Sequence, residues 1–163
     1  MQQRHTALEK AVAGLGRRWY GIEPATEQHI IELDRALPDG STESAVLDVV
    51  LPLRSGRQLI DVTIRQGSAG RAADVRAAAK KDGVPSLRAE REKHSRYPSA
   101  QLVAFAVEGC GRLGGEARAW LRRGASGQPA DLQVKELSRV HRVVSAAVQG
   151  ETARALCASA GLT

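Results

Sequence analysis

The chain has 163 residues, 42% of them hydrophobic and only 3% aromatic, so its core must be built mostly from Leu, Val, Ile and Ala. A formal net charge of +6 and a sequence pI of about 9.9 favour an anionic partner. No apolar run approaches the roughly 18 residues that a membrane helix needs, so a membrane span is excluded.

The first forty residues predict a helix, a short strand and a turn. Apolar residues from Leu8 to Trp19 recur at helical spacing, which predicts a helix over residues 4–19. Residues 27–33 are mixed in character and predict a first strand. The sequence PDGS at residues 38–41 is typical of a turn.

The clearest structural signal is a hairpin. Residues 45–53 (AVLDVVLPL) and 57–64 (RQLIDVTI) are rich in Val, Ile and Leu, and residues 54–56 between them suit a short loop. Each predicted strand carries one aspartate inside its apolar run, Asp48 in the first and Asp61 in the second.

The remainder of the chain alternates between helix and strand. Gly83 to Pro85 break the helical pattern, and Ser86 is a candidate N-cap for the helix that follows. This order of elements predicts an α/β (α+β) layer fold. Helices are predicted over residues 69–81, 86–97, 113–123 and 132–157, a strand over residues 101–107, and a loop over residues 124–129.

Charge is unevenly distributed along the chain. Residues 1–64 contain 7 Lys/Arg and 9 Asp/Glu, whereas residues 65–97 contain 9 and 4, and residues 98–163 contain 8 and 5. A metal-dependent nuclease needs early carboxylates for the metal and nearby cations for the phosphate backbone. The alternative is that the basic stretch is an ordinary solvated helix face.

Asp48 and Asp61 are the candidate chemical site. An ionisable side chain inside an apolar strand is costly unless it is paired or bound to a metal. Because a hairpin loop folds one strand back on the other, the two carboxylates are expected to lie close together. Carboxylate oxygens suit a hard cation such as Mg²⁺, which polarises a phosphate and activates water. The alternative is that one or both aspartates face solvent at the strand edges.

The spacing of these acids resembles a known family signature. Asp48 and Asp61, separated by twelve residues, are similar to the PD-x(12–14)-D motif of the restriction-like endonucleases of non-LTR retrotransposons, within the PD-(D/E)XK superfamily. Residues 92–97 (EKHSRY) resemble that family's helical Lys-and-Tyr segment. Residues 105–114 (FAVEGCGRLG) resemble part of the nuclease-like domains attached to reverse transcriptases. The likeness covers roughly residues 4–123.

The resemblance implies a fold and roles for individual residues. It implies a PD-(D/E)XK nuclease-like core over residues 1–123, with a central mixed sheet of about four strands flanked by helices, followed by a linker and C-terminal helical extension over residues 124–163. Asp48 and Asp61 would bind Mg²⁺ (or Mn²⁺). Lys93 would be the catalytic or phosphate-orienting lysine, supported by Tyr97 one helical turn later.

The chain also departs from the family pattern. Leu47 stands where the motif has proline, and Thr63 stands at the usual lysine position. Threonine carries no charge, so activity depends on Lys93 reaching the site from its helix. Glu27 is a candidate for an early acidic position, with Glu9, Glu23 and Glu32 as competitors.

The expected function is metal-dependent DNA cleavage by a domain of retroelement origin. The partners would be DNA and a reverse transcriptase domain of the same element. The alternatives are a degenerate nuclease fold that binds nucleic acid without cutting it, and a helical module that binds a protein partner. The cations expected to contact phosphates, without reading sequence, are Arg71, Arg76, Lys80, Lys81, Arg88, Arg91 and Arg96.

Several other classes of site are not expected. Cys110 and Cys157 form no CxxC or Cys/His cluster, which argues against structural zinc and favours free thiols. The glycines of residues 109–115 lack the Walker and Rossmann spacings, so no nucleotide cofactor is expected. The N-terminus has no signal-peptide pattern, so we expect an intracellular protein, nuclear or cytoplasmic and not secreted. The four histidines show no ligand spacing and are interpreted as surface or packing residues.

Overall fold

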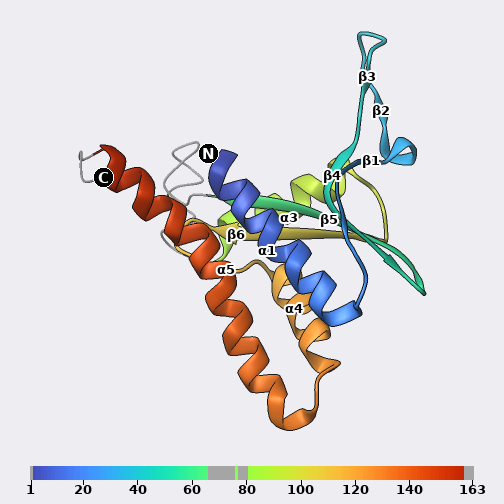
Figure 1. Cartoon of the computed structure of the whole chain (residues 1–163). Coiled ribbons are helices and arrows are strands. Elements are labelled where there is room, and N and C mark those ends of the chain that lie inside the picture. The colour runs from blue at the N-terminus through green and yellow to red at the C-terminus, as the bar shows by residue number, and fades with distance from the viewer. Residues whose placement is uncertain (1, 66–75, 77–80, 160–163) are drawn as a thin grey trace.

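A mixed sheet carries helices on both faces (Figure 1). The computed structural model describes residues 2–65, 76 and 81–159. Among these residues, the helices are α1 (Gln2–Tyr20), α3 (Val84–Arg96), α4 (Gly115–Ser126) and α5 (Ala130–Ser159), with a short 3-10 helix η1 (Ile31–Leu33). The strands are β1 (Ala25–His29), β2 (Arg35–Ala36), β3 (Thr42–Glu43), β4 (Val46–Leu53), β5 (Gly56–Arg65) and β6 (Leu102–Glu108).

The main sheet has the strand order β1-β4-β5-β6. Strands β1, β4 and β5 are antiparallel neighbours, and the predicted hairpin joins β4 to β5. Strand β6 lies parallel to β5, with Asp61 in register with Ala104. Parallel neighbours need a long crossover connection, and α3 forms part of it. The expected α/β (α+β) fold with a mixed four-stranded sheet is therefore confirmed at this level.

Side chains of β5 alternate between two apolar clusters. Ile60 and Val62 join the main core, which α1, α4 and α5 cover. Leu59 joins a second cluster that includes Tyr97 at the end of α3. Since successive strand residues point to opposite faces, Asp61 shares its face with Leu59 and is directed toward α3.

Helix α3 begins earlier than the sequence predicted. It starts at Val84 and not at Ser86, and Gly83 occupies the N-cap position with a φ of 78°. Proline is tolerated in a first helical turn, because the backbone N–H that it lacks would have no partner within the helix. Ser86 therefore lies inside the helix, where its hydroxyl donates to the Gly83 carbonyl oxygen at 3.0 Å. The prediction of Ser86 as the cap was wrong.

A small two-stranded arm precedes β4, and the sequence analysis predicted its turn but not its two strands. Strands β2 and β3 form a separate two-stranded sheet, joined by the turn at residues 38–40. The arm extends away from the main sheet (Figure 1). Arg96 of α3 contacts its base through an ion pair with Glu43, at 2.6 Å.

Helix α5 packs against α1 and α4 and contributes to the main core. Val140, Val144 and Val148 are buried in the same cluster as the sheet residues. Buried Glu136 also accepts hydrogen bonds from the Trp19 indole and from Arg18, both on α1. The division into residues 1–123 and 124–163 stays a prediction about domain organisation. None of the described helices meets the length and hydropathy that a bilayer span requires.

The helix predicted over residues 69–81 lies outside the described residues, apart from positions 76 and 81.

Candidate functional site

At Asp48, the regular backbone pairing of β4 is interrupted with both of its neighbouring strands, β1 and β5. The β1–β4 ladder omits the pair Glu27–Asp48, and Glu27 has a left-handed φ of 49°, which is uncommon for a residue other than glycine. The β4–β5 ladder ends at the pair Val49–Ile60. Asp48 and Asp61 are thus the first residues beyond that pair, at the point where the two strands separate.

Side chains take the place of ladder bonds at this point. The backbone N–H of Val62 donates to Asp48 Oδ2 at 2.6 Å. His5 Nε2 of α1 donates to the Val62 carbonyl oxygen at 3.0 Å and lies 3.5 Å from Asp48 Oδ2. Burial alone would raise the pKa of Asp48, but the hydrogen bonds from His5 and Val62 outweigh it and hold that pKa below its usual value. The hydrogen bond to Asp48 in turn raises the pKa of His5.

Asp61 is the more deeply buried acid, with 5% of its side chain exposed. Lys93 Nζ reaches from α3 to within 2.5 Å of Asp61 Oδ2. This ion-pair contact lacks the geometry of a hydrogen bond, and Oδ2 has no other hydrogen-bond partner. Burial raises the pKa of Asp61 to about 6; Lys93 opposes the shift and the Asp48 carboxyl adds to it.

The two carboxyl groups lie close enough to affect each other's ionisation. Asp48 raises the pKa of Asp61, and Asp61 lowers the pKa of Asp48. Asp61, with a pKa of about 6, is therefore the acid that takes up a proton first as the pH falls. The structure thus brings together the two aspartates and the lysine that the sequence singled out.

Tyr97 lies beside this pair as a packing residue. It is 5% exposed and belongs to the second apolar cluster. Lys93 Nζ is 6.0 Å from its ring centroid, and the Arg96 guanidinium is 5.1 Å from it. Both distances suit cation–π contacts, so the ring helps to fix the direction of Lys93.

Two residues of the site were missed by the sequence analysis. His5 was interpreted as a surface or packing residue, and Glu9 was only one of several competing acids. Glu9 is 7% exposed, and its pKa is raised by burial and by the charges of Asp48 and Glu27. The available signal was their spacing, because residues four apart share a helix face.

The other acidic competitors are occupied elsewhere. Glu23 forms an ion pair with Arg17, and Glu32 forms one with Arg57 at 3.3 Å. The charge of Glu27 raises the pKa of Glu9, and the register of β1 with β4 places Glu27 opposite Asp48.

Asp48 and Asp61 are the residues of this site that could hold a magnesium ion. Within the described part of the chain, no group of three or more His, Cys, Asp or Glu is arranged to hold a metal. Mg²⁺, however, is commonly held by one or two protein carboxylates, with water and substrate phosphate completing its shell. Asp61 Oδ2 is buried without a hydrogen bond and is contacted by Lys93 Nζ, so it is a carboxylate oxygen that could serve as a ligand to such an ion.

The predicted phosphate-contacting cations have different surroundings. Arg71 and Lys80 lie outside the described residues. Arg88 pairs with Glu92 and Arg96 with Glu43, so their charges are partly neutralised. Among the members that the structure describes, the exposed ones are Arg76, Lys81, Arg88 and Arg91.

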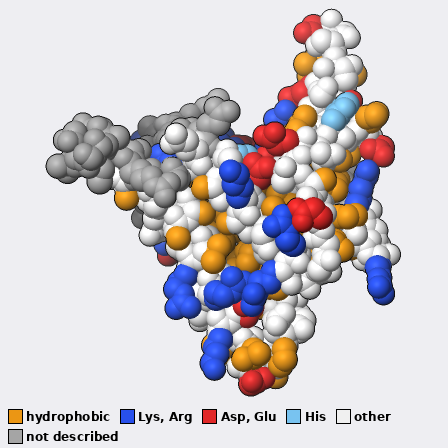
Figure 2. All heavy atoms as spheres, viewed as in Figure 1, with side chains coloured by type: hydrophobic (Ala, Val, Ile, Leu, Met, Phe, Trp, Pro, Cys, Tyr) orange, Lys and Arg blue, Asp and Glu red, His pale blue; other side chains and the backbone are white. Residues whose placement is uncertain are grey.

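Cationic side chains also gather away from that segment. Figure 2 shows Lys and Arg side chains in the lower half of one face, over the region of α1 and α5. Exposed cations on these two helices include Arg17, Arg18, Lys135 and Arg142. Sequence reasoning placed the basic surface within residues 65–97 and did not single out these positions.

Comparison of the chain with protein-family models, curated proteins and solved structures found no match.

Proposed function

We propose that the protein is a metal-dependent endonuclease that hydrolyses phosphodiester bonds in DNA, and that it derives from a retroelement. The observation that carries the proposal is the convergence of Asp48, Asp61 and Lys93 at the separation of β4 and β5. Two acids from adjacent strands and an amine 2.5 Å from one of them form a compact charged group in a largely buried setting. Perturbed carboxyl pKa values of this kind cluster at functional sites.

Each residue has a role that follows from its surroundings. Asp48 and Asp61 are the residues that would hold Mg²⁺ (or Mn²⁺), which when bound supplies a Lewis acid and an activated water. Lys93 carries a positive charge beside them and is placed to offset negative charge that develops on a phosphate. His5 orients Asp48, and Tyr97 limits the movement of Lys93.

The fold adds support. The sequence resemblance implied a mixed sheet of about four strands flanked by helices, with the acids on adjacent strands and the lysine on a following helix. The sheet order β1-β4-β5-β6 and the position of α3 agree with each of these features. Thr63 keeps the place of the usual lysine, and Lys93 supplies the cation from α3 in its stead.

The proposal is tested by plasmid nicking in Mg²⁺ with Asp48→Asn and Asp61→Asn. Loss of one metal-binding carboxylate should lower the nicking rate by at least about 100-fold. Asp82→Asn is the matched control, because the Asp82 side chain is 85% exposed and pairs with Arg112 outside the site. Circular dichroism checks that all variants stay folded. Equal nicking by the site variants and the control would reject the metal site.

A second candidate is a degenerate nuclease fold that binds DNA without cutting it. The observation that favours it is the Lys93–Asp61 ion pair, in which the lysine offsets part of the negative charge that a metal ion would otherwise neutralise. This reading expects DNA affinity that falls steeply with salt, and no nicking in either Mg²⁺ or Mn²⁺.

A further inference from the structure

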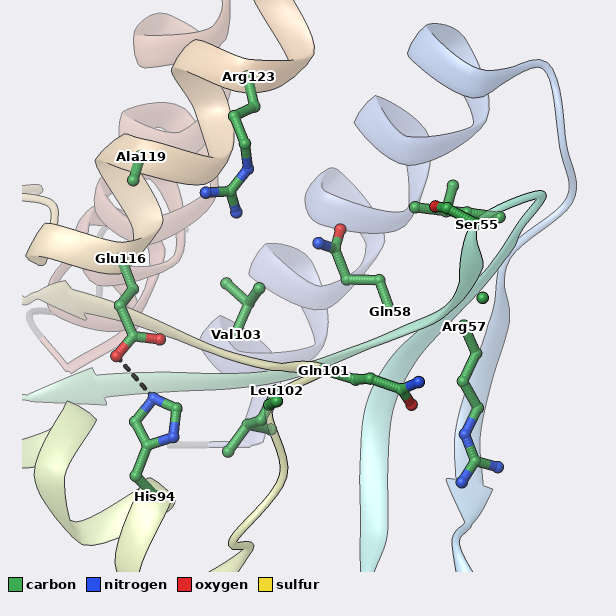
Figure 3. Close-up of a pocket in the computed structure, with 13 residues that line it drawn as sticks. Ser55, Arg57, Gln58, His94, Gln101, Leu102, Val103, Glu116, Ala119 and Arg123 are labelled. Carbon is green, nitrogen blue, oxygen red and sulfur yellow. Dashed lines mark hydrogen bonds and ion pairs between the residues drawn. The ribbon is translucent and has the colours of Figure 1, made fainter.

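A hollow lies between α4 and the β5–β6 end of the sheet, apart from the acid pair. It has a volume of about 630 Å³, and its polar lining includes Arg123, Gln58, His94 and Glu116. Figure 3 shows the Arg123 side chain extending from α4 toward Val103, with the Gln58 amide directed into the same space. The proposed cleavage site uses none of these side chains.

Arg123 is the cation that this hollow leaves unpaired. Its guanidinium makes no ion pair with any described carboxylate, including Glu116 in the same lining. Arg57 also lines the hollow, but it forms an ion pair with Glu32, and Figure 3 shows it directed away from Arg123. An unpaired guanidinium aimed into a polar hollow is suited to an anion, above all a phosphate.

The neighbouring polar groups favour an acceptor ligand. Gln58 Oε1 accepts from the Trp120 indole at 2.6 Å, which leaves the Gln58 amide NH₂ to donate into the hollow. Both oxygens of Glu116 are already used: Oε1 contacts His94 Nε2 at 2.7 Å, and Oε2 accepts from the Ala104 N–H at 2.9 Å. The Glu116 carboxylate is therefore already bonded to α3 and β6, and it leaves the Arg123 guanidinium and the Gln58 NH₂ free to donate.

We propose that this hollow binds a backbone phosphate of the DNA, with Arg123 and Gln58 as the contacting residues. The inference rests on the proposed function and gives the nucleic acid a second point of attachment. Helix α3 connects the two places, since Lys93 faces the acid pair and His94, the next residue, lines the hollow. A phosphate held here would fix the register of the strand without reading its sequence.

The test compares Arg123→Gln with Arg122→Gln in DNA binding measured by fluorescence anisotropy in EDTA. Both substitutions remove one positive charge from an exposed position of α4, but Arg122 does not line the hollow. Arg123→Gln should weaken binding by about tenfold and reduce the salt slope by about one, whereas Arg122→Gln should stay within about twofold of wild type. Equal effects of the two variants overturn the proposal, because they show only general electrostatics.

A second variant guards against misfolding. Gln58→Glu keeps an acceptor for Trp120 and places an anion in the hollow, so it should weaken DNA binding as Arg123→Gln does; unchanged binding overturns the proposal. Inorganic phosphate, followed by the NMR shift of the Trp120 indole, separates the two sources of phosphate. A shift that depends on Arg123, together with unchanged DNA affinity in Arg123→Gln, assigns the hollow to free phosphate and overturns the DNA assignment.

Failure of this inference is distinct from failure of the proposed function. Nicking by wild type, with DNA affinity unaffected by Arg123→Gln, rejects only the second attachment point. Affinity that depends on Arg123, without nicking in Mg²⁺ or Mn²⁺, rejects catalysis and leaves the attachment point standing.

Discussion

At the scale of single residues, the buried Asp61 carboxylate lowers the stability of the fold, although the proposed function requires it. Its carboxyl is almost fully buried, and burial raises its pKa to about 6, so the folded protein binds this proton more tightly than the unfolded chain does. In the unfolded chain the same group ionises near the ordinary aspartate pKa of 3.8. Above pH 6 the folded protein must therefore carry a buried negative charge, which Lys93 offsets only in part.

Asp61→Asn should stabilise the protein at pH 8 by about 1–3 kcal/mol and leave it nearly unchanged at pH 4. Between the unfolded and the folded pKa the native state binds more protons, so the wild-type free energy of unfolding falls as pH rises through that window and is level above it. Urea unfolding at both pH values, with EDTA present, measures the difference. If the wild-type free energy of unfolding rose relative to that of Asp61→Asn as the pH increased, the predicted direction of the pH dependence would be wrong.

At the scale of elements, α4 and α1 approach each other at one glycine. A Cβ on Gly124 would lie 2.0 Å from an atom of the Trp19 ring, so this contact requires glycine. Trp19 in turn lies 5.1 Å from Trp120, ring centroid to ring centroid. Trp120 is fully buried and makes an edge contact with Phe105 of β6. The glycine thus allows a line of aromatic contacts from α1 through α4 to the sheet.

Gly124→Ala should lower the free energy of unfolding by about 1–3 kcal/mol, because Trp19 must move to admit the methyl group. Gly127→Ala is the matched control: its Cβ would meet its nearest atom at 3.6 Å, and its backbone is right-handed helical. That control should be neutral or gain a few tenths of a kcal/mol, because alanine restricts the unfolded chain. Chemical denaturation followed by tryptophan fluorescence compares the two.

At the scale of the whole molecule, α5 and the sheet share one core. The valines of α5 pack in the same cluster as β4, β5 and β6, and Glu136 fastens the helix to α1. Hydrogen bonds from Arg139, Trp19 and Arg18 outweigh burial and lower the pKa of Glu136 to about 2. We therefore expect α5 and the sheet to unfold together.

Val144→Ala should lower the free energy of unfolding by about 2 kcal/mol, because it leaves a cavity at a position that is 1% exposed. Tryptophan fluorescence, which reports on Trp19 and Trp120 in the core, and circular dichroism should give the same shifted midpoint. Val134→Ala, at a position 73% exposed on the same helix, is the control and should change little. A tryptophan fluorescence midpoint unaffected by Val144→Ala would indicate that α5 is a separate extension.

The sequence alone determined the elements whose signals are local. Continuous Val, Ile and Leu runs identified β4, β5 and β6, and the short loop at residues 54–56 identified the β4–β5 hairpin. That hairpin also determined that Asp48 and Asp61 come close together, because two strands joined by a short loop have few possible registers.

The tertiary structure decided everything that depends on residues distant in the chain. The parallel pairing of β5 with β6 brings α3 over Asp61 and directs Lys93 toward it, while the packing of α1 brings His5 and Glu9 beside Asp48. The local sequence pattern also does not predict that Arg123 lines a hollow or that Glu116 accepts a hydrogen bond from the backbone of β6. The local sequence pattern predicts which face of a helix or strand is apolar. Which charged side chains come into contact depends on how the helices pack on the sheet, and burial of the whole apolar core determines that packing.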